Sequence, residues 1–450
     1  MKTIANIPAN HHKRIVIVGG GFAGLKLAKS LRNSNFQVVL LDKNNYHQFQ
    51  PLFYQVATAG LEPSAITFPL RKVFQHQSHI HFRMGELQNI APEKKVIVTG
   101  IGQLPYDYLV IAIGANTNFF GNKNIEQRAI PMKSLNEAIQ LRNTILLHLE
   151  QALNEQDQNS VGRLLNIAIA GGGPTGVELA GALAEMRSYI LPKDYPELDF
   201  SRMKIYLLEA SPKVLNGYSE PSSKMARQYL ERLGVEVRVS TLVEDYDGEE
   251  VRLGNGGTLP TDTLIWAAGI KGNEVKGLPP EAFGQGGRIL VNEFNQVKNC
   301  PAIFAIGDIA LMPTTSYDRG HPQVATVAIQ QAALLRENFE SLELHKPLKP
   351  FRYHEKGSLA TVGRNLAVAD LPGFRLQGFF AWILWLFVHL MEILGVKNKL
   401  FVFINWAWSY FTLDQSLRLL IRPERKGAVP GKKPPAPVAA GLPDHQPLVK

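Results

Sequence analysis

Two glycine-rich segments, each followed by one acidic residue, carry the groups of this sequence that are best suited to bind a charged ligand. In the first segment Gly19, Gly21 and Gly24 have the spacing GxGxxG, and Asp42 follows the last glycine by about 18 residues. Glycines at these positions permit a sharp turn, let backbone N–H groups reach a pyrophosphate, and let a helix approach a strand closely. A carboxylate at Asp42 can bind a ribose hydroxyl. The pattern predicts a dinucleotide site.

The second segment repeats the spacing at Gly171, Gly173 and Gly176. Its acidic residue is Glu209, about 33 residues after the last glycine, because an insertion lengthens the connection. A carboxylate there would accept the ribose 2′-hydroxyl and repel a 2′-phosphate. We therefore expect the second dinucleotide to be NADH rather than NADPH.

The elements that must position these residues are two copies of one strand, turn and helix unit. Apolar runs at residues 15–18 and 167–170 predict buried parallel strands, and helical apolar spacing follows each glycine segment. Two more strands are predicted at residues 107–115 and 262–270, each with an Asp before it and Ala-x-Gly at its end. Their final glycines are Gly114 and Gly269. The repetition predicts an internal duplication.

Three further segments complete the expected architecture. A third buried strand at residues 302–310 ends in Gly307 and Asp308, where a carboxylate could bind a sugar-like chain or a plain turn could form. Residues 134–153 have helical apolar spacing and predict a helix that bridges the two dinucleotide units. Residues 44–60 predict a loop rich in aromatics and amides, which lies near a ligand or fills a small core of its own.

The composition limits the classes of protein that fit. A chain of 450 residues with 45% apolar content is long enough for two or three domains with substantial cores. Its one cysteine, Cys300, excludes a disulfide framework and a CxxC redox pair and fits a reducing compartment. Residues 1–12 lack the pattern of a secretory signal, and no metal site is expected.

The net charge of +9 is concentrated near the end of the chain. Residues 375–450 contain ten Lys and Arg against four Asp and Glu, a net of 10 − 4 = +6. The same segment holds Trp382, Trp385, Trp406 and Trp408, four of the five tryptophans. Basic charge beside clustered aromatics fits an anionic membrane surface better than nucleic acid, so we expect no nucleic-acid partner.

The apolar runs of this C-terminal segment predict how it meets the membrane. Residues 379–396 are nearly long enough to span a bilayer, whereas the aromatic run at residues 400–413 is too short to return. Residues 413–426 have an amphipathic pattern. We favour a helix lying in the membrane interface over a spanning hairpin, and the segment could also form a dimer contact. Residues 427–450 are rich in Pro and Ala and predict a disordered tail.

Taken together, these motifs resemble those of flavoproteins with two dinucleotide-binding domains. GGGFAG at residues 19–24 matches the FAD motif, GGGPTG at residues 171–176 the NADH motif, and AIGD at residues 305–308 the motif for the flavin's ribityl chain. Within that superfamily the sequence is similar to type II NADH:quinone oxidoreductases from residue 13 to about residue 422.

Two stretches carry the quinone part of the resemblance. Residues 322–332 are similar to the family's AQxAxQ motif, in which Thr326 replaces the first glutamine while Gln330 still matches. Residues 354–364 are similar to the family's Lys-Gly segment near the quinone, and the resemblance implies that Lys356 and Leu359 belong to the quinone site. The resemblance implies that Gln330 hydrogen-bonds a quinone carbonyl and that Lys356 stabilises charge on the quinol oxygen.

The resemblance also implies a role for Glu178, two residues past Gly176. The matching glutamate of the family lies near the flavin and the quinone pocket, where it could orient the nicotinamide or relay protons. Favourable interaction with the helix dipole is the simpler alternative. The cofactor-binding residues implied are Gly19, Gly21, Gly24, Asp42, Lys43, Gln55, Ala57, Gly114, Gly307 and Asp308 for FAD, and Gly171, Gly173, Gly176, Glu209 and Gly269 for NADH.

The expected fold class is α/β, with two Rossmann-like domains and a C-terminal aromatic and amphipathic helical segment that attaches to a membrane. We expect an FAD domain at residues 1–120 and 295–350, an NADH domain at 121–294, an attachment region at 351–426 and the tail at 427–450. The implied protein is a homodimeric, non-proton-pumping enzyme of the respiratory chain, monotopic on the inner face of the cytoplasmic membrane with its NADH site toward the cytoplasm.

Several alternatives share this fold. Disulfide reductases and sulfide:quinone oxidoreductases need at least two redox cysteines near the flavin, and this chain has only Cys300. A soluble FAD-dependent NAD(P)H reductase of a protein or small molecule, such as a ferredoxin reductase, stays open, although it has no evident need of the aromatic C-terminal segment. A flavin-bound, membrane-attached interaction protein without redox activity is the non-enzymatic alternative.

Overall fold

The computed structural model describes residues 2–8, 11–414 and 417–420. Its first unit is built on a six-stranded sheet with the order β21-β22-β9-β1-β2-β5, in which only β21 runs antiparallel to its neighbour. These strands are β1 (Arg14–Val18), β2 (Gln37–Asp42), β5 (Ile80–Met84), β9 (Tyr108–Ile111), β21 (Gln296–Val297) and β22 (Cys300–Ala305). The sheet therefore combines an N-terminal segment with a segment almost 190 residues later in the sequence.

The second unit repeats this sheet in the middle of the chain. Its five parallel strands have the order β11-β18-β12-β13-β14. They are β11 (Ile130–Pro131), β12 (Ile167–Ala170), β13 (Ile205–Leu208), β14 (Glu236–Arg238) and β18 (Thr263–Trp266). Strand β1, which precedes the first glycine loop, lies between β2 and β9. Strand β12, which precedes the second glycine loop, lies between β13 and β18 in the same way. This matching order confirms the predicted duplication.

Each sheet lies between a helical layer and a small antiparallel sheet. In the first unit α1 (Phe22–Ser30) and α10 (Ala325–Glu343) pack together on one face. The other face packs on β6 (Leu87–Ala91), β7 (Val96–Thr99) and β8 (Gly102–Pro105). The central strands β1, β2 and β9 are apolar over most of their length because both of their faces are covered, as in other parallel sheets, whereas the edge strand β5 alternates apolar and polar residues.

The second unit has the same layers. Helices α5 (Leu135–Ala152), α6 (Gln158–Leu165), α7 (Pro174–Glu185) and α9 (Glu220–Arg232) cover one face. The opposite face packs on β15 (Val243–Tyr246), β16 (Glu250–Leu253) and β17 (Thr258–Pro260). The predicted helix at residues 134–153 is α5, and a capping box between Ser134 and Glu137 fixes its start. It contacts α2 (Phe53–Ala57), a segment that follows β2 in the chain and packs in the core of the second unit.

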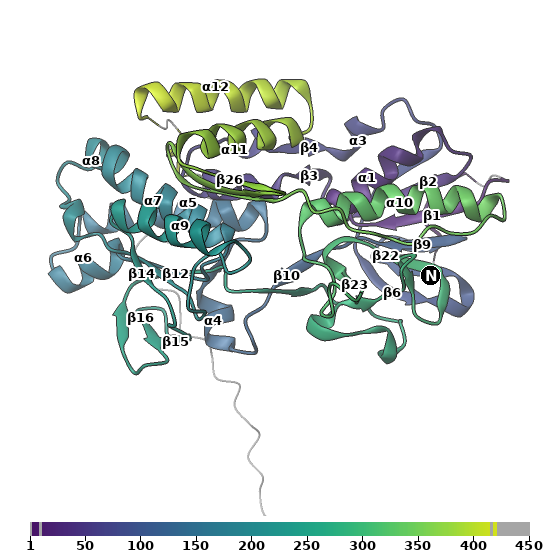
Figure 1. Cartoon of the computed structure of the whole chain (residues 1–450), viewed down its shortest axis with the longest axis horizontal. Coiled ribbons are helices and arrows are strands. Elements are labelled where there is room, and N and C mark those ends of the chain that lie inside the picture. The colour runs from purple at the N-terminus through teal and green to yellow at the C-terminus, as the bar shows by residue number, and fades with distance from the viewer. Residues whose placement is uncertain (1, 9–10, 415–416, 421–450) are drawn as a thin grey trace, which may run out of the picture.

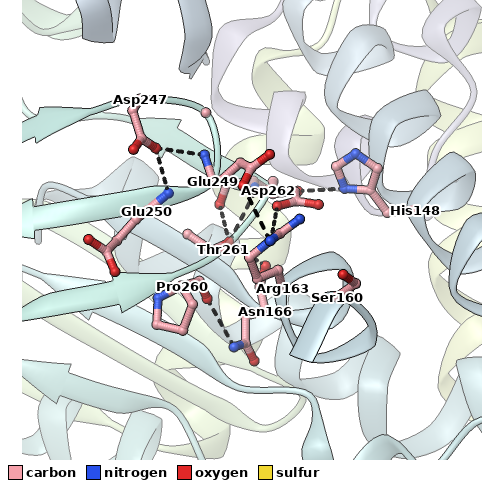
Figure 2. Close-up of polar contacts among 12 residues, drawn as sticks. His148, Ser160, Arg163, Asn166, Asp247, Glu249, Glu250, Pro260, Thr261 and Asp262 are labelled. Carbon is pink, nitrogen blue, oxygen red and sulfur yellow. Dashed lines mark hydrogen bonds and ion pairs between the residues drawn. The ribbon is translucent and has the colours of Figure 1, made fainter. Parts of the chain in front are cut away.

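A polar cluster joins the small sheet of the second unit to α6 (Figure 2). Arg163 on α6 forms ion pairs with Asp262 at 3.0 Å and with Glu249 at 3.3 Å. The buried hydroxyl of Thr261 donates to the carbonyl oxygen of Asn166, the residue just before β12. These contacts hold the small sheet against the unit at the end far from the glycine loops.

One pair of strands connects the units. Strand β10 (Ala115–Thr117) follows the first unit's sheet, β19 (Ile270–Gly272) follows the second unit's sheet, and the two pair antiparallel between the units (Figure 1). Because these strands begin one residue after Gly114 and Gly269, the Ala-x-Gly ends of the repeated strands meet at the junction.

The C-terminal part forms a third layer across both units (Figure 1). A sheet of β24 (Ser358–Gly363), β25 (Leu366–Leu371) and β26 (Phe374–Gln377) is followed by α11 (Phe379–Glu392) and α12 (Val396–Thr412). Gly395, with φ +84°, separates the two helices inside the apolar run. No helix of the described residues is both long and apolar enough to cross a membrane.

The structure corrects two expectations. Residues 44–60 are not a loop: they form β3 (Tyr46–Gln48), a 3-10 turn and α2, whose apolar residues join the core of the second unit. In the amphipathic stretch at residues 413–426, the described residues Leu417–Leu420 form no helix. The apolar runs before it form the helices instead, because their side chains pack against the sheet β24-β25-β26 and α2. The predicted tail at residues 427–450 lies outside the described residues.

Candidate active site

The two glycine loops have the same geometry. A Cβ on Gly19 would lie 2.3 Å from the carbonyl oxygen of Ala112, and the equivalent distance for Gly171 is 2.4 Å to Ala267. Both glycines have positive φ, +107° and +109°. A Cβ on Gly24 or on Gly176 would lie 1.9 Å from a carbonyl oxygen of its own loop. No side chain fits at these positions, so helix and strand approach through bare backbone.

The middle glycine of each loop faces open space. A Cβ on Gly21 or Gly173 would meet no atom within 4 Å, and these residues are the N-caps of α1 and α7. Neither helix has a side chain that caps its N-terminus. The backbone N–H groups there point to a space that suits a pyrophosphate, which the helix dipole also favours.

The acidic residues Asp42 and Glu209 occupy equivalent positions beside these loops. One oxygen of Asp42 accepts from the N–H of Gly20 at 2.5 Å, and one oxygen of Glu209 accepts from the N–H of Gly172 at 2.6 Å. The second oxygen of each binds the backbone N–H two residues later. Burial raises the pKa of Asp42, and these N–H groups partly offset it. Both carboxylates are held by backbone and suit a ribose hydroxyl, so the residues fit FAD in the first unit and NADH in the second.

The turn at Gly307 and Asp308 is held by a residue that the sequence did not single out. Gln331, which is 1% exposed, accepts a hydrogen bond from the N–H of Gly307 at 2.7 Å. The carboxylate of Asp308 pairs with Lys133 at 3.4 Å, across the boundary between the units. The turn follows β22 at the same sheet edge as the loop at Gly19, so the contact of Asp308 with the ribityl chain of a flavin stays a prediction that this position supports.

A cavity of about 1660 Å³ lies between the two units and the C-terminal layer. It is larger than the about 300–1,000 Å³ of a site for one small ligand, so it has room for more than one ligand. The predicted site residues that line it are Gly171, Gly173, Glu178, Glu209, Gly269, Lys356 and Leu359. Its opposite wall comes from α1, the segment around Phe49 and the C-terminal part of α11.

Glu178 lies at the centre of this arrangement. It is 8% exposed, and its Oε1 accepts from the indole Nε1 of Trp385 at 3.2 Å and from the N–H of Thr361 at 3.5 Å. Burial raises the pKa of Glu178 to about 8, although these two donors lower it. A carboxyl group that carries a proton near neutral pH inside a substrate cavity can act as an acid.

Of the residues predicted to bind the quinone, some line the cavity and Gln330 does not. Gln330 does not line the cavity: both ends of its amide bind the backbone of His354, at 2.9 and 3.0 Å. Thr326 does line it, and its hydroxyl lies 2.9 Å from the hydroxyl of Tyr353. Lys356 is exposed in the same wall. A direct bond from Gln330 to a quinone therefore does not fit this geometry, and Gln330 instead fixes the segment that presents Lys356.

Three residues proposed for the cofactor lie elsewhere. Gln55 donates to the hydroxyl of Tyr54 at 2.8 Å and accepts from Trp406 at 2.7 Å, so it ties α2 to α12. Ala57 is buried in the core, and Lys43 is exposed beside Asp42. None of the three lines the large cavity, and neither do Gly19, Asp42 and Asp308, so the cofactor role of these residues stays a prediction.

Two cavity residues were missed by the sequence patterns. Tyr54 is buried on α2 and lines the cavity. His389 on α11 stacks on Trp385 with ring centroids 3.9 Å apart, and burial lowers its pKa to about 4. The signal for His389 was present, since it is one of few polar residues in an apolar run, but its spacing alone does not show which way it faces.

Comparisons with known proteins agree with this geometry. The family described as pyridine nucleotide-disulphide oxidoreductase matches residues 13–332, and the NDH2 C-terminal domain matches residues 355–412. A type II NADH:quinone oxidoreductase of Mycobacterium tuberculosis is 32% identical over 420 residues, 90% of this chain and 89% of the relative. One of Haemophilus influenzae is 29% identical over 84% of this chain and 93% of its own length.

The fold is also that of a solved structure. NDH2 from Plasmodium falciparum in complex with NADH superposes with a TM-score of 0.84 at 22% identity and covers 92% of this chain and all of its own. Both family matches, their order along the chain and the full-length relatives agree with the duplicated sheets and the C-terminal layer described above. The chain belongs to the family of type II NADH:quinone oxidoreductases.

Proposed function

We infer that this protein is an FAD-dependent NADH:quinone oxidoreductase that transfers two electrons from NADH to a membrane quinone. The observation that carries this inference is the single cavity of about 1660 Å³ that reaches from the NADH loop to the C-terminal helices. Gly173 and Glu209 line one part of it, and Leu384, Val388 and Met391 of α11 line another. A polar hydride donor and an apolar acceptor can therefore meet in one space.

Bound FAD supplies the two-electron chemistry, and the chain positions the substrates and handles the protons. The N-terminus of α7 and the carboxylate of Glu209 hold the NADH pyrophosphate and ribose. Glu178 holds a proton beside the cavity and delivers it to a quinone oxygen. Lys356 lies where its charge stabilises the reduced oxygen, and Gln330 positions Lys356 through the backbone of His354.

We also propose that α11 and α12 attach the protein to a membrane surface. Both helices expose large apolar side chains, among them Phe380 at 72%, Phe387 at 61% and Phe411 at 83%. Lys397 and Lys399 lie at the start of α12, where they can meet anionic headgroups. Because α11 lines the cavity as well, a quinone would enter from the lipid side.

The finer parts of the proposal concern assembly and location. We propose a homodimer at the inner face of the cytoplasmic membrane, with the NADH site toward the cytoplasm. A large exposed apolar surface supports a membrane or a subunit contact, and a single buried cysteine suits a reducing compartment. Sedimentation of the detergent-solubilised protein tests the dimer, and a mass of one chain contradicts it.

Stopped-flow spectroscopy tests the function directly. NADH should bleach the bound flavin, and ubiquinone and menaquinone analogues should then restore its absorbance. A flavin that NADH reduces but no quinone reoxidises, and that a soluble electron-transfer protein does reoxidise, would favour the soluble reductase instead. Absence of bleaching by NADH would contradict any NADH-dependent activity.

A further inference from the structure

A second, smaller cavity of about 140 Å³ lies behind Glu178, between α2, α7, β24, α11 and α12. It is below the about 300 Å³ at which small-molecule sites begin, so it does not suit a quinone ring, but it has room for several water molecules. The polar groups along it include Thr58, Glu178, Glu185, Arg364 and Ser409. Tyr189, which is 47% exposed, marks its side toward solvent.

The two cavities share a wall. Glu178 and Tyr54 line both of them, whereas Trp385 lines only the smaller cavity and His389 only the larger one. Tyr54 is buried, and that burial raises its pKa well above its ordinary value, so it is a neutral phenol. Glu178 is therefore the ionisable group that can exchange a proton with either side.

A second buried carboxyl group lies further along the smaller cavity. Glu185 follows Glu178 by seven residues, two turns of α7, so both side chains lie on the same face of that helix. Burial raises the pKa of Glu185, and the backbone N–H and the charge of Arg364 partly offset it. The N–H of Arg364 donates to Glu185 at 2.5 Å.

The surroundings of Glu185 favour water. The Nε of Arg364 is buried without a hydrogen-bond partner among the described residues, and a buried donor of this kind is satisfied by water. The same guanidinium stacks on Tyr410 of α12 at 4.1 Å. Directly after Glu185 the chain forms a π-helical turn, Met186–Ile190, a feature frequent at functional sites. The other ionisable groups that line this cavity are Tyr54, Tyr189, Arg364 and Tyr410, and Tyr218 lies close enough to Glu178 to interact with it.

The chemistry requires a proton path of this kind. Reduction of a quinone to a quinol takes two electrons and two protons, and the hydride of NADH carries two electrons and one proton. Each turnover therefore takes one proton from solvent. A flavin and a quinone that fill the large cavity would displace water from it, so the second proton would need another route.

Resting on the proposed function, we propose that the smaller cavity is a water-filled proton inlet in which Glu185 passes protons from solvent to Glu178. Glu178 gives its proton to a quinone oxygen and becomes a carboxylate. Water in the cavity returns a proton to Glu178 from Glu185, and Glu185 takes its replacement from solvent at the side of Tyr189. The bonds made and broken are O–H bonds only.

The test measures the two half-reactions separately by stopped-flow in Glu185→Gln and in Ala182→Leu, which narrows the cavity without removing a carboxyl group. Flavin reduction by NADH should stay within about twofold of wild type. Reoxidation by a soluble quinone analogue should slow by about tenfold or more in both variants. The reoxidation rate of both variants should also gain a solvent isotope effect, so that it is lower in D2O than in H2O. Formate should restore the rate of Glu185→Ala, because a small acid can replace the missing carboxyl group.

Glu150→Gln is the matched control, since this carboxylate lies on α5 in a different surface pocket and should change neither half-reaction. Wild-type reoxidation rates in both Glu185→Gln and Ala182→Leu would overturn the proposal. Slower reoxidation without an isotope effect and without formate rescue would also overturn it, because it indicates only a structural role. Failure of the wild-type enzyme to reduce any quinone would instead reject the proposed function.

Discussion

The indole Nε1 of Trp385 donates a hydrogen bond to Oε1 of Glu178 at 3.2 Å. The carboxyl group belongs to the first turns of α7 in the second nucleotide-binding unit, and the indole belongs to α11 in the C-terminal layer. The two are 207 residues apart in the chain. A helix of the C-terminal layer therefore contributes directly to the environment of the proposed acid.

This contact gives a pH prediction for Glu178. Its pKa of about 8 lies above the ordinary 4.5, so the group is protonated at neutral pH and loses its proton as the pH rises through about 8. Quinone reduction should fall above that pH. Glu178→Gln should slow flavin reoxidation by about 100-fold while NADH still reduces the flavin. Stopped-flow pH profiles of both half-reactions measure this.

Trp385→Phe is the companion variant. This variant lacks the N–H donor, which should raise the pKa of Glu178 by about one further unit and move the falling limb of the pH profile to higher pH. A falling limb that stays in place would show that the indole does not act on Glu178.

The raised pKa of Glu178 also predicts how the stability of the fold depends on pH. Between about pH 4.5 and 8 the unfolded chain loses this proton while the folded chain keeps it, so the free energy of unfolding falls with rising pH. Glu178→Gln should remove that dependence.

The duplicated loops offer a matched pair of variants. Glu209→Gln keeps the size of the side chain but removes the charge that accepts from Gly172 and repels a 2′-phosphate. We expect the KM for NADH to rise about tenfold and the preference over NADPH to shrink, in line with the loss of one charged hydrogen bond. Asp42→Asn, the equivalent change in the first unit, should instead weaken retention of FAD. Nucleotide preferences that remain unchanged in Glu209→Gln would remove its ribose role.

Neighbouring glutamines should have different effects. Gln331→Leu leaves the buried N–H of Gly307 without an acceptor, which should cost about 1–3 kcal/mol locally and release FAD more easily. Gln330→Leu frees the backbone of His354 and should raise the KM for quinone with FAD still bound. Flavin content by absorbance and quinone kinetics separate the two. Equal FAD retention in both variants would contradict the assignment.

One close approach predicts a change in stability. A Cβ on Gly181 would lie 1.5 Å from the carbonyl oxygen of Val362, because α7 crosses β24 there. Gly181→Ala should therefore destabilise the fold by about 1–3 kcal/mol or more and displace Glu178 from Thr361. Gly162→Ala, inside α6 with no atom within 4 Å of the added Cβ, should be neutral or slightly stabilising. Thermal unfolding compares the two.

The exposed apolar surface predicts how the protein partitions. Phe387→Glu with Phe411→Glu places two charges on the outward faces of α11 and α12. Binding to vesicles with anionic lipid should fall about 100-fold or more, since two large apolar side chains no longer enter the interface. Oxidation of NADH by a water-soluble quinone should persist. Unchanged vesicle flotation would place the membrane contact elsewhere.

The sequence alone determined the duplicated nucleotide units. Gly19 and Gly171, the strands before them and the carboxylates Asp42 and Glu209 follow from local rules, because a positive φ and a buried parallel strand leave few choices of residue. The lengths of the apolar runs at residues 379–396 and 400–413 also favoured helices that do not span a bilayer, and no helix of the described residues is long and apolar enough to span one.

Only the tertiary structure decided which side chains face the substrates. Gln330 and Gln331 are adjacent in sequence, yet one binds His354 and the other holds Gly307, because a helix turns its side chains by about 100° per residue. The environment of Glu178 depends on Trp385 and Thr361, which come from elements more than 180 residues away. Burial and long-range hydrogen bonds set its pKa, and no local pattern encodes them.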